Sequence, residues 1–365
     1  MKICFITTGN INSLATMKRA TGMAQTLIEN GFAVTIVALD CLDNRNRFQL
    51  ECPDAQILYF QEGSAINELS QKKKIVKLLK PDFIYVCSIG FRNWIHKYNS
   101  GCSNCIVEHS ELASSIKNNK KRIVYKLIEH LSLVLFNGQI YASRYLEQFF
   151  SKKNQSLKLK NKELYLPYAF NDEILSNYSP LLSLIQNDFA QKKVVLYMGT
   201  LSLNYGFLDI LKAVELLKKE RKDFVFLVMG SGRHKSIGEV YVQENNLKDE
   251  VQFLGFVPEE DVSSYFKVAD VFVSPLYDTV QDWARCPSKL FMYLPFEKPI
   301  VTCKIGEAKE LFSNQGYYFL PQDVNSLTKT LNLALDSESL IYNVQPSKHT
   351  WKYRTNEFIN WLEKF

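Results

Sequence analysis

The chain has 365 residues, of which 46% are hydrophobic and 22% are charged, a composition that excludes a disordered, collagen-like or small disulfide-stapled protein. The length predicts two domains, since one domain commonly has roughly 100–200 residues. The formal net charge of +6 is unevenly distributed: residues 1–170 carry 23 Lys and Arg against 13 Asp and Glu, and residues 171–365 carry 21 against 25. The first half is therefore basic, at +10, and the rest is acidic, at −4.

The sequence begins without a signal-peptide pattern, because the apolar run at residues 3–6 is too short and no small-residue cleavage site follows it. No stretch approaches the roughly 20 apolar residues that span a bilayer. We therefore expect a cytoplasmic protein whose eight cysteines are free thiols. Cys102 and Cys105 form a Cys-x-x-Cys pair with no second pair at zinc-finger spacing, so no metal site is expected there.

A βαβ unit opens the chain. Residues 3–7 and 33–39 are apolar and read as strands, and between them apolar residues recur at helical spacing from Ala20 to Ile28, followed by a helix stop at Gly31. Buried strands that alternate with helices predict a parallel sheet covered on both faces. Further strands are expected at 57–60, 83–87, 105–108, 140–143 and 164–166, and helices at about 66–80, 119–136 and 144–151.

The same alternation resumes after Pro167 and a linker with a short helix at residues 171–190. Strands are expected at 194–198, 224–229, 251–254, 271–274, 299–303 and 317–320, and helices at 206–220, 236–246, 259–268, from 288, at 307–312, 324–335 and 351–365. The fold class is therefore α/β, with two tandem Rossmann-like doubly wound domains and a cleft between them.

Three clusters supply much of the positive charge of the first half, namely Lys72 to Lys74, Lys120 to Arg122, and Lys152 with Lys153. Two interpretations stay open: a solvated face, or a surface of this domain that binds anionic membrane headgroups. No nucleic-acid motif accompanies the charge, so no nucleic acid is expected as a partner.

The loops after the strands of the second half are the expected ligand site, because ligands of open α/β sheets bind beyond the carboxyl ends of the strands. Gly199, Gly230 and Gly255 each follow a strand and would let a ligand approach the backbone. A helix that opens at Pro287, Ser288 and Lys289 would add backbone N–H groups, a hydroxyl and an ammonium, which suit an anion.

The order of these motifs resembles the retaining glycosyltransferases of family 4, which have the two-domain fold known as glycosyltransferase B. The segments "VVLYMGTL", "FVFLVMGSG", "VQFLGFV", "ADVFVSPL" and "PSKLFMYLPFEKPIV" follow the family's order and spacing, and the resemblance covers nearly the whole chain. It implies an acceptor-binding domain at 1–170, a domain at 171–345 that binds a nucleotide-diphosphate sugar, and a last helix at 346–365 that packs back on the first domain. The donor-binding residues that we expect are Gly199, Thr200, Gly230, Gly255, Phe256, Val257, Asp282, Ser288, Lys289 and Leu290.

The resemblance also implies a catalytic histidine in the first domain. His109 matches the family's histidine, is expected to face the cleft and, as a neutral imidazole, would hydrogen-bond a donor-sugar hydroxyl; a loop or core histidine is the alternative. A solvated helix face is the alternative for Lys18 and Arg19. The acceptor-binding residues that we expect are Gly9, Asn10, Lys18, Arg19 and Glu111.

The chain departs from the family's pattern at its charged positions. Ala284 and Met292 replace both carboxylates of the Glu-x7-Glu motif, and Thr200 and Tyr205 replace the Arg and Lys that hold the diphosphate. We expect Arg285 and Lys289 to supply the positive charge of the catalytic site, and Asp278 or Asp282 to replace a sugar-binding carboxylate.

These features predict a hexosyl- or N-acetylhexosaminyltransferase that needs no metal or cofactor. It would transfer sugar from a UDP- or GDP-sugar to a hydroxyl of a cell-surface glycan or lipid-linked precursor, as in polysaccharide or lipopolysaccharide biosynthesis, with retention and on the inner face of the membrane. The first alternative is a degenerate homologue that binds a nucleotide sugar or a partner enzyme without turnover. A two-lobed solute-binding protein and a nucleotide-sugar epimerase are further alternatives.

Overall fold

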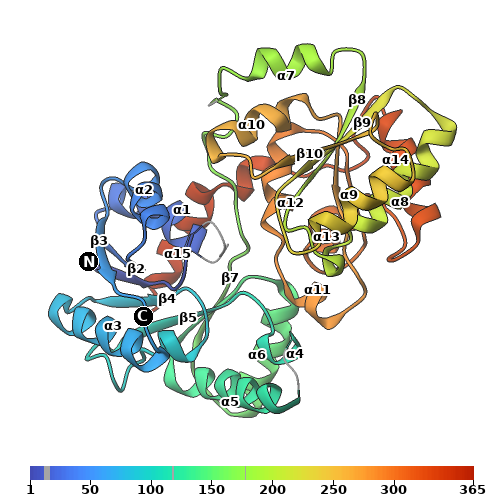
Figure 1. The fold of residues 1–365 in the computed structure, drawn as a ribbon. Helices are drawn as coiled ribbons and strands as arrows, with labels where there is room; N and C mark the ends of the chain where they lie inside the picture. Colours follow the sequence, from blue (N-terminus) through green and yellow to red (C-terminus); the bar gives the residue numbers. More distant parts are fainter. Residues whose placement is uncertain (12–16, 117–118, 177) are drawn as a thin grey trace. The chain divides into compact units, whose positions relative to one another are not determined.

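A computed structural model describes residues 1–11, 17–116, 119–176 and 178–365. The chain forms two compact units, each built on a parallel sheet of its own (Figure 1). Unit 1 comprises Met1–Phe170, Ala284–Cys286 and Ser347–Phe365, and unit 2 comprises Asn171–Trp283 and Pro287–Pro346.

The sheet of unit 1 has seven strands in the order β3-β2-β1-β4-β5-β6-β7, and every pair is parallel. The strands are β1 (Lys2–Ile6), β2 (Ala33–Leu39), β3 (Gln56–Phe60), β4 (Phe83–Val86), β5 (Asn104–His109), β6 (Gly138–Tyr141) and β7 (Lys162–Tyr165). The helices are α1 (Met17–Glu29), α2 (Leu42–Glu51), α3 (Ala65–Leu79), α4 (Ala113–Ile116), α5 (Asn119–Leu135), α6 (Arg144–Ser156) and α15 (Trp351–Leu362).

Both faces of this sheet are covered, because successive side chains of a strand point to opposite faces. The ring of Tyr85 on β4 lies 5.6 Å from that of Phe358 on α15. Its neighbours Ile84 and Val86 instead join a buried cluster with Val76 of α3. The near-continuous apolar sequence of the strands therefore reflects burial on both faces.

The sheet of unit 2 has six parallel strands in the order β10-β9-β8-β11-β12-β13. They are β8 (Lys193–Met198), β9 (Phe224–Met229), β10 (Val251–Gly255), β11 (Val271–Ser274), β12 (Ile300–Thr302) and β13 (Tyr317–Tyr318). The helices are α7 (Leu182–Asp188), α8 (Phe207–Glu220), α9 (Lys235–Glu244), α10 (Glu259–Val268), α11 (Val280–Ala284), α12 (Ser288–Tyr293), α13 (Gly306–Phe312) and α14 (Val324–Leu335).

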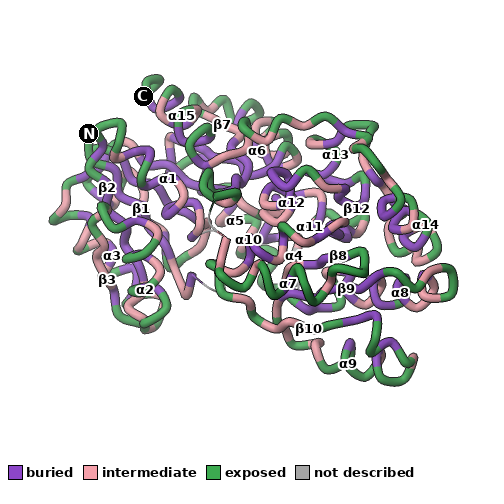
Figure 2. Tube along the Cα trace, turned by 90° about the horizontal axis from the view of Figure 1, so that it is seen from above, coloured by how far each residue is buried: buried purple, intermediate pink, exposed green. Residues whose placement is uncertain are grey.

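The α/β class and the two parallel sheets are confirmed, and most elements begin and end within a few residues of the predicted bounds. Figure 2 shows buried residues along strands such as β1, β8 and β9, whereas α7 is mostly exposed. Helix α2 was not predicted, because Asn44 and Phe48 are its only buried residues and its apolar pattern is weak.

A short segment of the second half was not predicted to belong to unit 1. The Ser143 hydroxyl donates a hydrogen bond to the Ala284 carbonyl at 2.6 Å, and the Tyr168 N–H donates to the Cys286 sulfur at 3.3 Å. Ala284 itself is buried in an apolar cluster with Tyr141 and other residues of unit 1. The chain therefore returns to unit 1 at this segment as well as at its carboxyl end.

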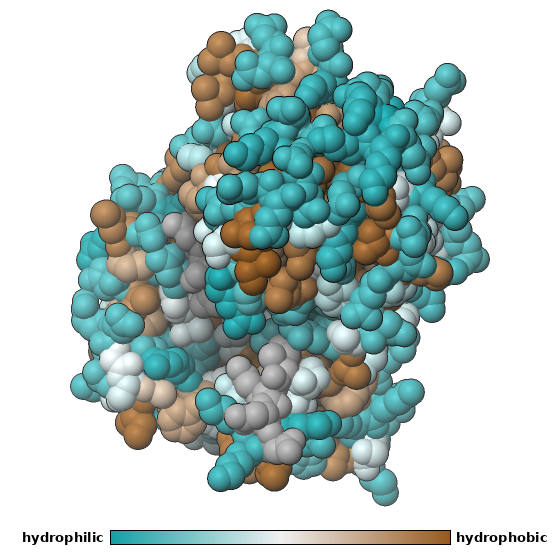
Figure 3. Space-filling view, turned by 45° about the vertical axis from the view of Figure 1, so that its right-hand side comes forward, coloured by the Kyte–Doolittle hydropathy of each residue, from teal (hydrophilic) through white to brown (hydrophobic). Residues whose placement is uncertain are grey.

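The surface face shown in Figure 3 is mostly hydrophilic, with separate apolar patches. Across the described part of the chain, no helix is both long and apolar enough to cross a membrane.

Candidate functional site

Two glycine loops lie in backbone contact at the carboxyl edge of the unit 2 sheet. The loop after β8 pairs with the loop after β9, since Gly199 N donates to Met229 O at 3.0 Å and Leu201 N donates to Ser231 O at 2.9 Å. A Cβ added to Gly230 would lie 2.1 Å from the Gly199 carbonyl oxygen. Gly199 and Gly230 also have positive φ values, +154° and +125°, which favour glycine. At Gly230 the backbone conformation and the lack of space for a Cβ therefore both require glycine.

The loop after β10 extends the same edge. Gly230 N donates to the Gly255 carbonyl at 2.6 Å, and Gly255 has a φ of +71°. The structure therefore brings together three of the predicted donor-binding glycines, one from each of three adjacent strands. Phe256, which follows them, is 66% exposed, and Val257 is half-buried.

Lys289 adds a positive charge next to this glycine edge. Its ammonium nitrogen lies 4.3 Å from the centre of the Tyr197 ring and 3.4 Å from the place where a Gly199 Cβ would be. The Tyr197 hydroxyl in turn donates a hydrogen bond to the backbone carbonyl of Thr200 at 3.2 Å, and Thr200 is exposed. Helix α12, which carries Lys289, is held against the end of β8, because Met198 N donates to the Tyr293 hydroxyl at 3.0 Å.

The remaining residues predicted to bind the donor differ in how accessible their side chains are. Helix α12 begins at the predicted residue, Ser288, but has only six residues, so the lysine rather than a long helix dipole supplies the charge. The Leu290 side chain is fully buried. Asp282 is buried too, and its carboxylate accepts a hydrogen bond from Tyr277 N at 2.7 Å, which holds its own loop together. Asp278 accepts from the Trp283 indole at 2.7 Å.

The sequence did not suggest the residues that position these loops. His234 N donates to Leu201 O at 3.1 Å, and the Nδ1 atom of His234 accepts from Leu203 N at 3.2 Å. The Tyr277 hydroxyl donates to Asp209 at 2.6 Å, and burial raises the pKa of Tyr277. His234 directly follows the "GSGR" segment, which was its only available signal.

His109, the predicted catalytic histidine, ends strand β5 but is fully buried inside unit 1. Its Nε2 atom lies 2.9 Å from Gln139 Oε1, and its ring centre lies 4.0 Å from that of Phe150. Burial lowers the pKa of His109 to about 4, so the imidazole is neutral at pH 7. The structure corrects the expectation of a cleft-facing side chain: the alternative, a core histidine, describes its position.

Arg19 is a second correction, because the structure encloses its guanidinium completely in unit 1. The Nε atom lies 2.8 Å from Glu108 Oε2, and Nη2 donates to the Leu166 carbonyl at 2.7 Å. The rings of Tyr168 and Trp351 flank it at 4.9 and 5.7 Å. Arg19 is therefore part of the core of its own unit and is not exposed to an acceptor.

The loop after β1 holds two other residues predicted to bind the acceptor. Gly9, with a φ of +72°, accepts at its carbonyl from Asn44 at 3.0 Å, and Asn10 donates to Asp43 at 2.6 Å. The Asn44 amide oxygen also accepts from Ile11 N at 2.8 Å. Asn44 thus positions this loop, and it was missed together with α2. Lys18 on α1 is half-buried, and Glu111 after β5 is exposed.

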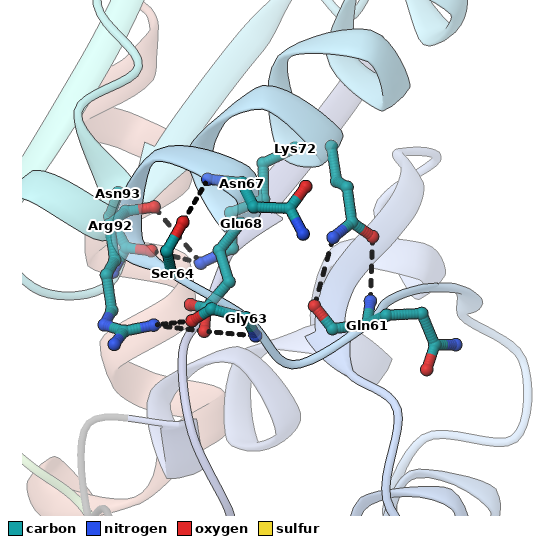
Figure 4. A network of polar contacts seen from close by, with 9 residues as sticks. Gln61, Gly63, Ser64, Asn67, Glu68, Lys72, Arg92 and Asn93 are labelled. Atoms are coloured by element: carbon teal, nitrogen blue, oxygen red, sulfur yellow. Dashed lines mark hydrogen bonds and ion pairs between the residues drawn. The ribbon is translucent and has the colours of Figure 1, made fainter.

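A further polar cluster lies beyond β3 and β4 of unit 1 (Figure 4). The fully buried Lys72 donates from its ammonium to Asn93 Oδ1 at 2.7 Å and to the Arg92 carbonyl at 3.3 Å. Arg92 forms an ion pair with Glu68 and donates to the Gly63 carbonyl at 3.0 Å. Desolvation lowers the pKa of Lys72 to about 7.

The two cations predicted for the diphosphate belong to different units: Arg285 lies in the unit 1 segment and Lys289 in unit 2. Buried Ala284 and half-buried Met292 offer no carboxylate. In the ranges that the structure describes, no group of three or more His, Cys, Asp or Glu side chains is placed to hold a metal ion.

Comparison with known proteins finds similarity between the second half of the chain and sugar-transferring enzymes. Residues 185–357 match the family described as glycosyl transferases group 1. The 2-deoxystreptamine N-acetyl-D-glucosaminyltransferase of Niallia circulans is 26% identical over 113 residues, a match that spans only 29% of the length of that relative and 29% of this chain. The amylovoran biosynthesis glycosyltransferase AmsK of Erwinia amylovora is 20% identical over 330 residues, 79% of each chain.

The fold is similar to that of HepE from Anabaena, solved in complex with UDP, with a TM-score of 0.77, 13% identity and coverage of 100% of both chains. The HepE complex with UDP-glucose gives a TM-score of 0.74 and 14% identity over 100% of this chain and 95% of that one. Both units are thus Rossmann-like domains of the glycosyltransferase B fold. Together with the family match, this fold supports a glycosyltransferase.

Proposed function

We propose that this protein is a metal-independent glycosyltransferase that uses a UDP- or GDP-sugar as donor. It transfers a hexosyl or N-acetylhexosaminyl group, with retention of configuration, to a hydroxyl of a cell-surface glycan or a lipid-linked oligosaccharide precursor. The carrying observation is the backbone contact of Gly199 with Gly230 beside the Lys289 ammonium. Close-packed glycine backbone at the end of a parallel sheet, next to a lysine, suits a diphosphate.

The chemistry requires positive charge where the leaving diphosphate develops negative charge. The bond between the anomeric carbon and the diphosphate oxygen breaks, the acceptor oxygen bonds to the same carbon, and the acceptor proton passes to the departing diphosphate or to water. Lys289 would stabilise the departing group, and loss of one such donor typically costs about 3 kcal/mol of transition-state energy. The neutral His109 core histidine takes no part in these steps.

Several observations support the choice of substrates. The structures of HepE contain UDP and UDP-glucose, so UDP-sugars are the first donors to test. The relative AmsK is described as an amylovoran biosynthesis enzyme, which favours a polysaccharide precursor as acceptor. The basic first half favours a cytoplasmic protein bound peripherally to the anionic inner face of a membrane.

A thermal-shift screen of UDP-, GDP- and ADP-sugars tests the donor. A ligand that binds only the folded state stabilises it by RT ln(1 + [L]/Kd), so a donor at 100 times its Kd adds about 2.7 kcal/mol. Lys289→Ala should weaken binding of the stabilising nucleotide sugar at least several-fold. Lys212→Ala, which removes an exposed charge on α8, is the matched control and should bind normally. Equal affinity of the two variants would remove Lys289 from the site.

The second candidate is a protein that binds a nucleotide sugar or a partner enzyme without turnover. Ala284 and Met292 favour it, because neither of these positions carries a carboxylate and Ala284 is enclosed in an apolar cluster. Incubation with the stabilising donor distinguishes the candidates. Consumption of the donor with an α- or β-anomeric product matching the donor's configuration, read by proton NMR, supports the retaining transferase; binding with no consumption in the presence of acceptor extracts supports the second candidate.

A further inference from the structure

Helix α5 (Asn119–Leu135) turns an apolar stripe away from its own unit. Ile123, Leu127 and Val134 are 71%, 56% and 37% exposed, and half-buried Leu131 lies between the last two. Positions i, i+4, i+8 and i+11 share one face of a helix. Apolar residues on the surface side of a helix are the reverse of the usual pattern.

The opposite face of α5 is fixed to unit 1 by polar contacts. Glu129 and Ser132 are buried, and Glu129 accepts a hydrogen bond from Ser114 N at 2.8 Å. Gln139 on strand β6 donates a hydrogen bond to the Ser132 carbonyl at 3.2 Å. Since rotating the helix would bury the stripe only by breaking these contacts, the outward orientation of Ile123 and Leu127 is specified.

Positive charge surrounds the outward stripe. Lys120, Arg122 and Lys126 are exposed beside Ile123 and Leu127, and residues 119–128 contain no carboxylate. Lysine is depleted in protein–protein interfaces, and a second copy of the helix would bring like charges together. Cationic side chains around an apolar helix face instead match an anionic bilayer, whose headgroups attract lysine and whose acyl boundary takes up apolar side chains.

We infer that α5 is a membrane-docking helix, which binds the anionic lipid surface through Lys120, Arg122 and Lys126 and inserts Ile123 and Leu127 at the acyl boundary. The inference rests on the proposed function for its purpose, because docking would bring unit 1 to a lipid-linked acceptor. It adds to that function the element that makes the contact and the lipid charge that it requires.

Vesicle flotation of the full chain tests the inference. The protein should float with vesicles of equal parts phosphatidylcholine and phosphatidylglycerol, not with phosphatidylcholine alone, and less at high salt. Each charge removed should weaken binding about fivefold, so the triple variant K120Q/R122Q/K126Q should lose roughly 100-fold. Leu127→Glu should lose at least about tenfold. Leu333→Glu on α14, at a site that is 61% exposed, is the control and should float like the parent protein.

Equal flotation with neutral vesicles, or unchanged flotation of both α5 variants, would overturn the inference. Concentration-dependent dimerisation in sedimentation runs that Leu127→Glu abolishes, without vesicle binding, would assign the stripe to a second copy instead. The nucleotide-sugar thermal shift of each variant separates the two proposals. Intact donor binding with no flotation removes only the docking helix, whereas flotation without any donor binding removes only the transferase.

Discussion

The guanidinium of Arg19 and the carboxylate of Glu108 form an ion pair with an N–O distance of 2.8 Å, and neither side chain has any exposed surface. The Tyr85 hydroxyl donates to the same carboxylate oxygen at 3.0 Å, so helix α1 and strands β4 and β5 meet at one polar point. Arg19 also reaches the carbonyl of Leu166 just beyond β7. The pair thus links parts of unit 1 that are distant in the sequence.

Arg19→Met should destabilise the protein by about 3–5 kcal/mol, because it leaves the Glu108 carboxylate buried without a partner. Urea unfolding of unit 1, followed by tryptophan fluorescence, measures the loss. The double variant R19M/E108L removes both charges and should recover most of it, since apolar replacement of a buried pair is often neutral. A single variant as stable as the parent would show that water reaches Glu108.

Arg19 also illustrates what the sequence could not reveal. The periodicity of Ala20, Met23, Ala24 and Leu27 predicted α1 correctly, because burial of one helix face imposes that spacing. The same pattern put Arg19 next to Lys18 on a polar face, since its partner Glu108 lies 89 positions away in the sequence. Pairing of distant polar residues leaves no local signal, so the buried role was missed.

The candidate site also has features that were predictable from the sequence and features that were not. The glycines after β8, β9 and β10 were predictable, because strand ends show in the apolar pattern and parallel strands share one carboxyl edge. The buried position of His109 and the return of Ala284–Cys286 to unit 1 were not, because both depend on packing between distant segments. Lys289 was predicted from its place at a helix start, but its contact with Tyr197 was not.

Gly230→Ala should destabilise unit 2 by more than about 2 kcal/mol, because the new Cβ would meet the Gly199 carbonyl oxygen at 2.1 Å on a backbone with φ of +125°. Gly255→Ala is the matched control. Its φ of +71° is also unfavourable, but no atom lies within 4 Å of the new Cβ, so the cost should be about 1 kcal/mol. Equal melting temperatures for the two variants would show that the loops separate to accept a side chain.

His109 should make stability depend on pH in the acid range. Burial lowers the folded pKa to about 4 from an ordinary 6.5, so the unfolded state binds more protons between these values. The contribution of His109 to the free energy of unfolding is fully present above pH 6.5 and is lost as pH falls toward 4, by on the order of 3 kcal/mol.

His109→Asn, which keeps a donor for Gln139 but cannot titrate, should flatten the slope of unfolding free energy against pH. His349, whose pKa burial also lowers to about 4, and His96, whose pKa burial lowers as well, contribute to the slope that remains. A slope unchanged by the substitution would place His109 in contact with solvent.

Lys72 should produce a dependence of the same sign, on the alkaline side. Desolvation lowers its pKa from 10.5 to about 7, against the attraction of Glu68 and with the repulsion of Arg92 (Figure 4). The unfolded state then binds more protons between pH 7 and pH 10.5, so the free energy of unfolding rises with pH through that window, by on the order of 5 kcal/mol. Residue 72 of the Lys72→Met variant cannot titrate, so the free energy of unfolding of this variant should fall relative to that of the parent as pH rises. The comparison should favour the variant most near pH 7. Lys77→Met, at an exposed position of the same helix, should stay parallel to the parent at every pH. Parallel curves for Lys72→Met as well would mean that its ammonium keeps its charge inside the cluster, held by Asn93 and the Arg92 carbonyl.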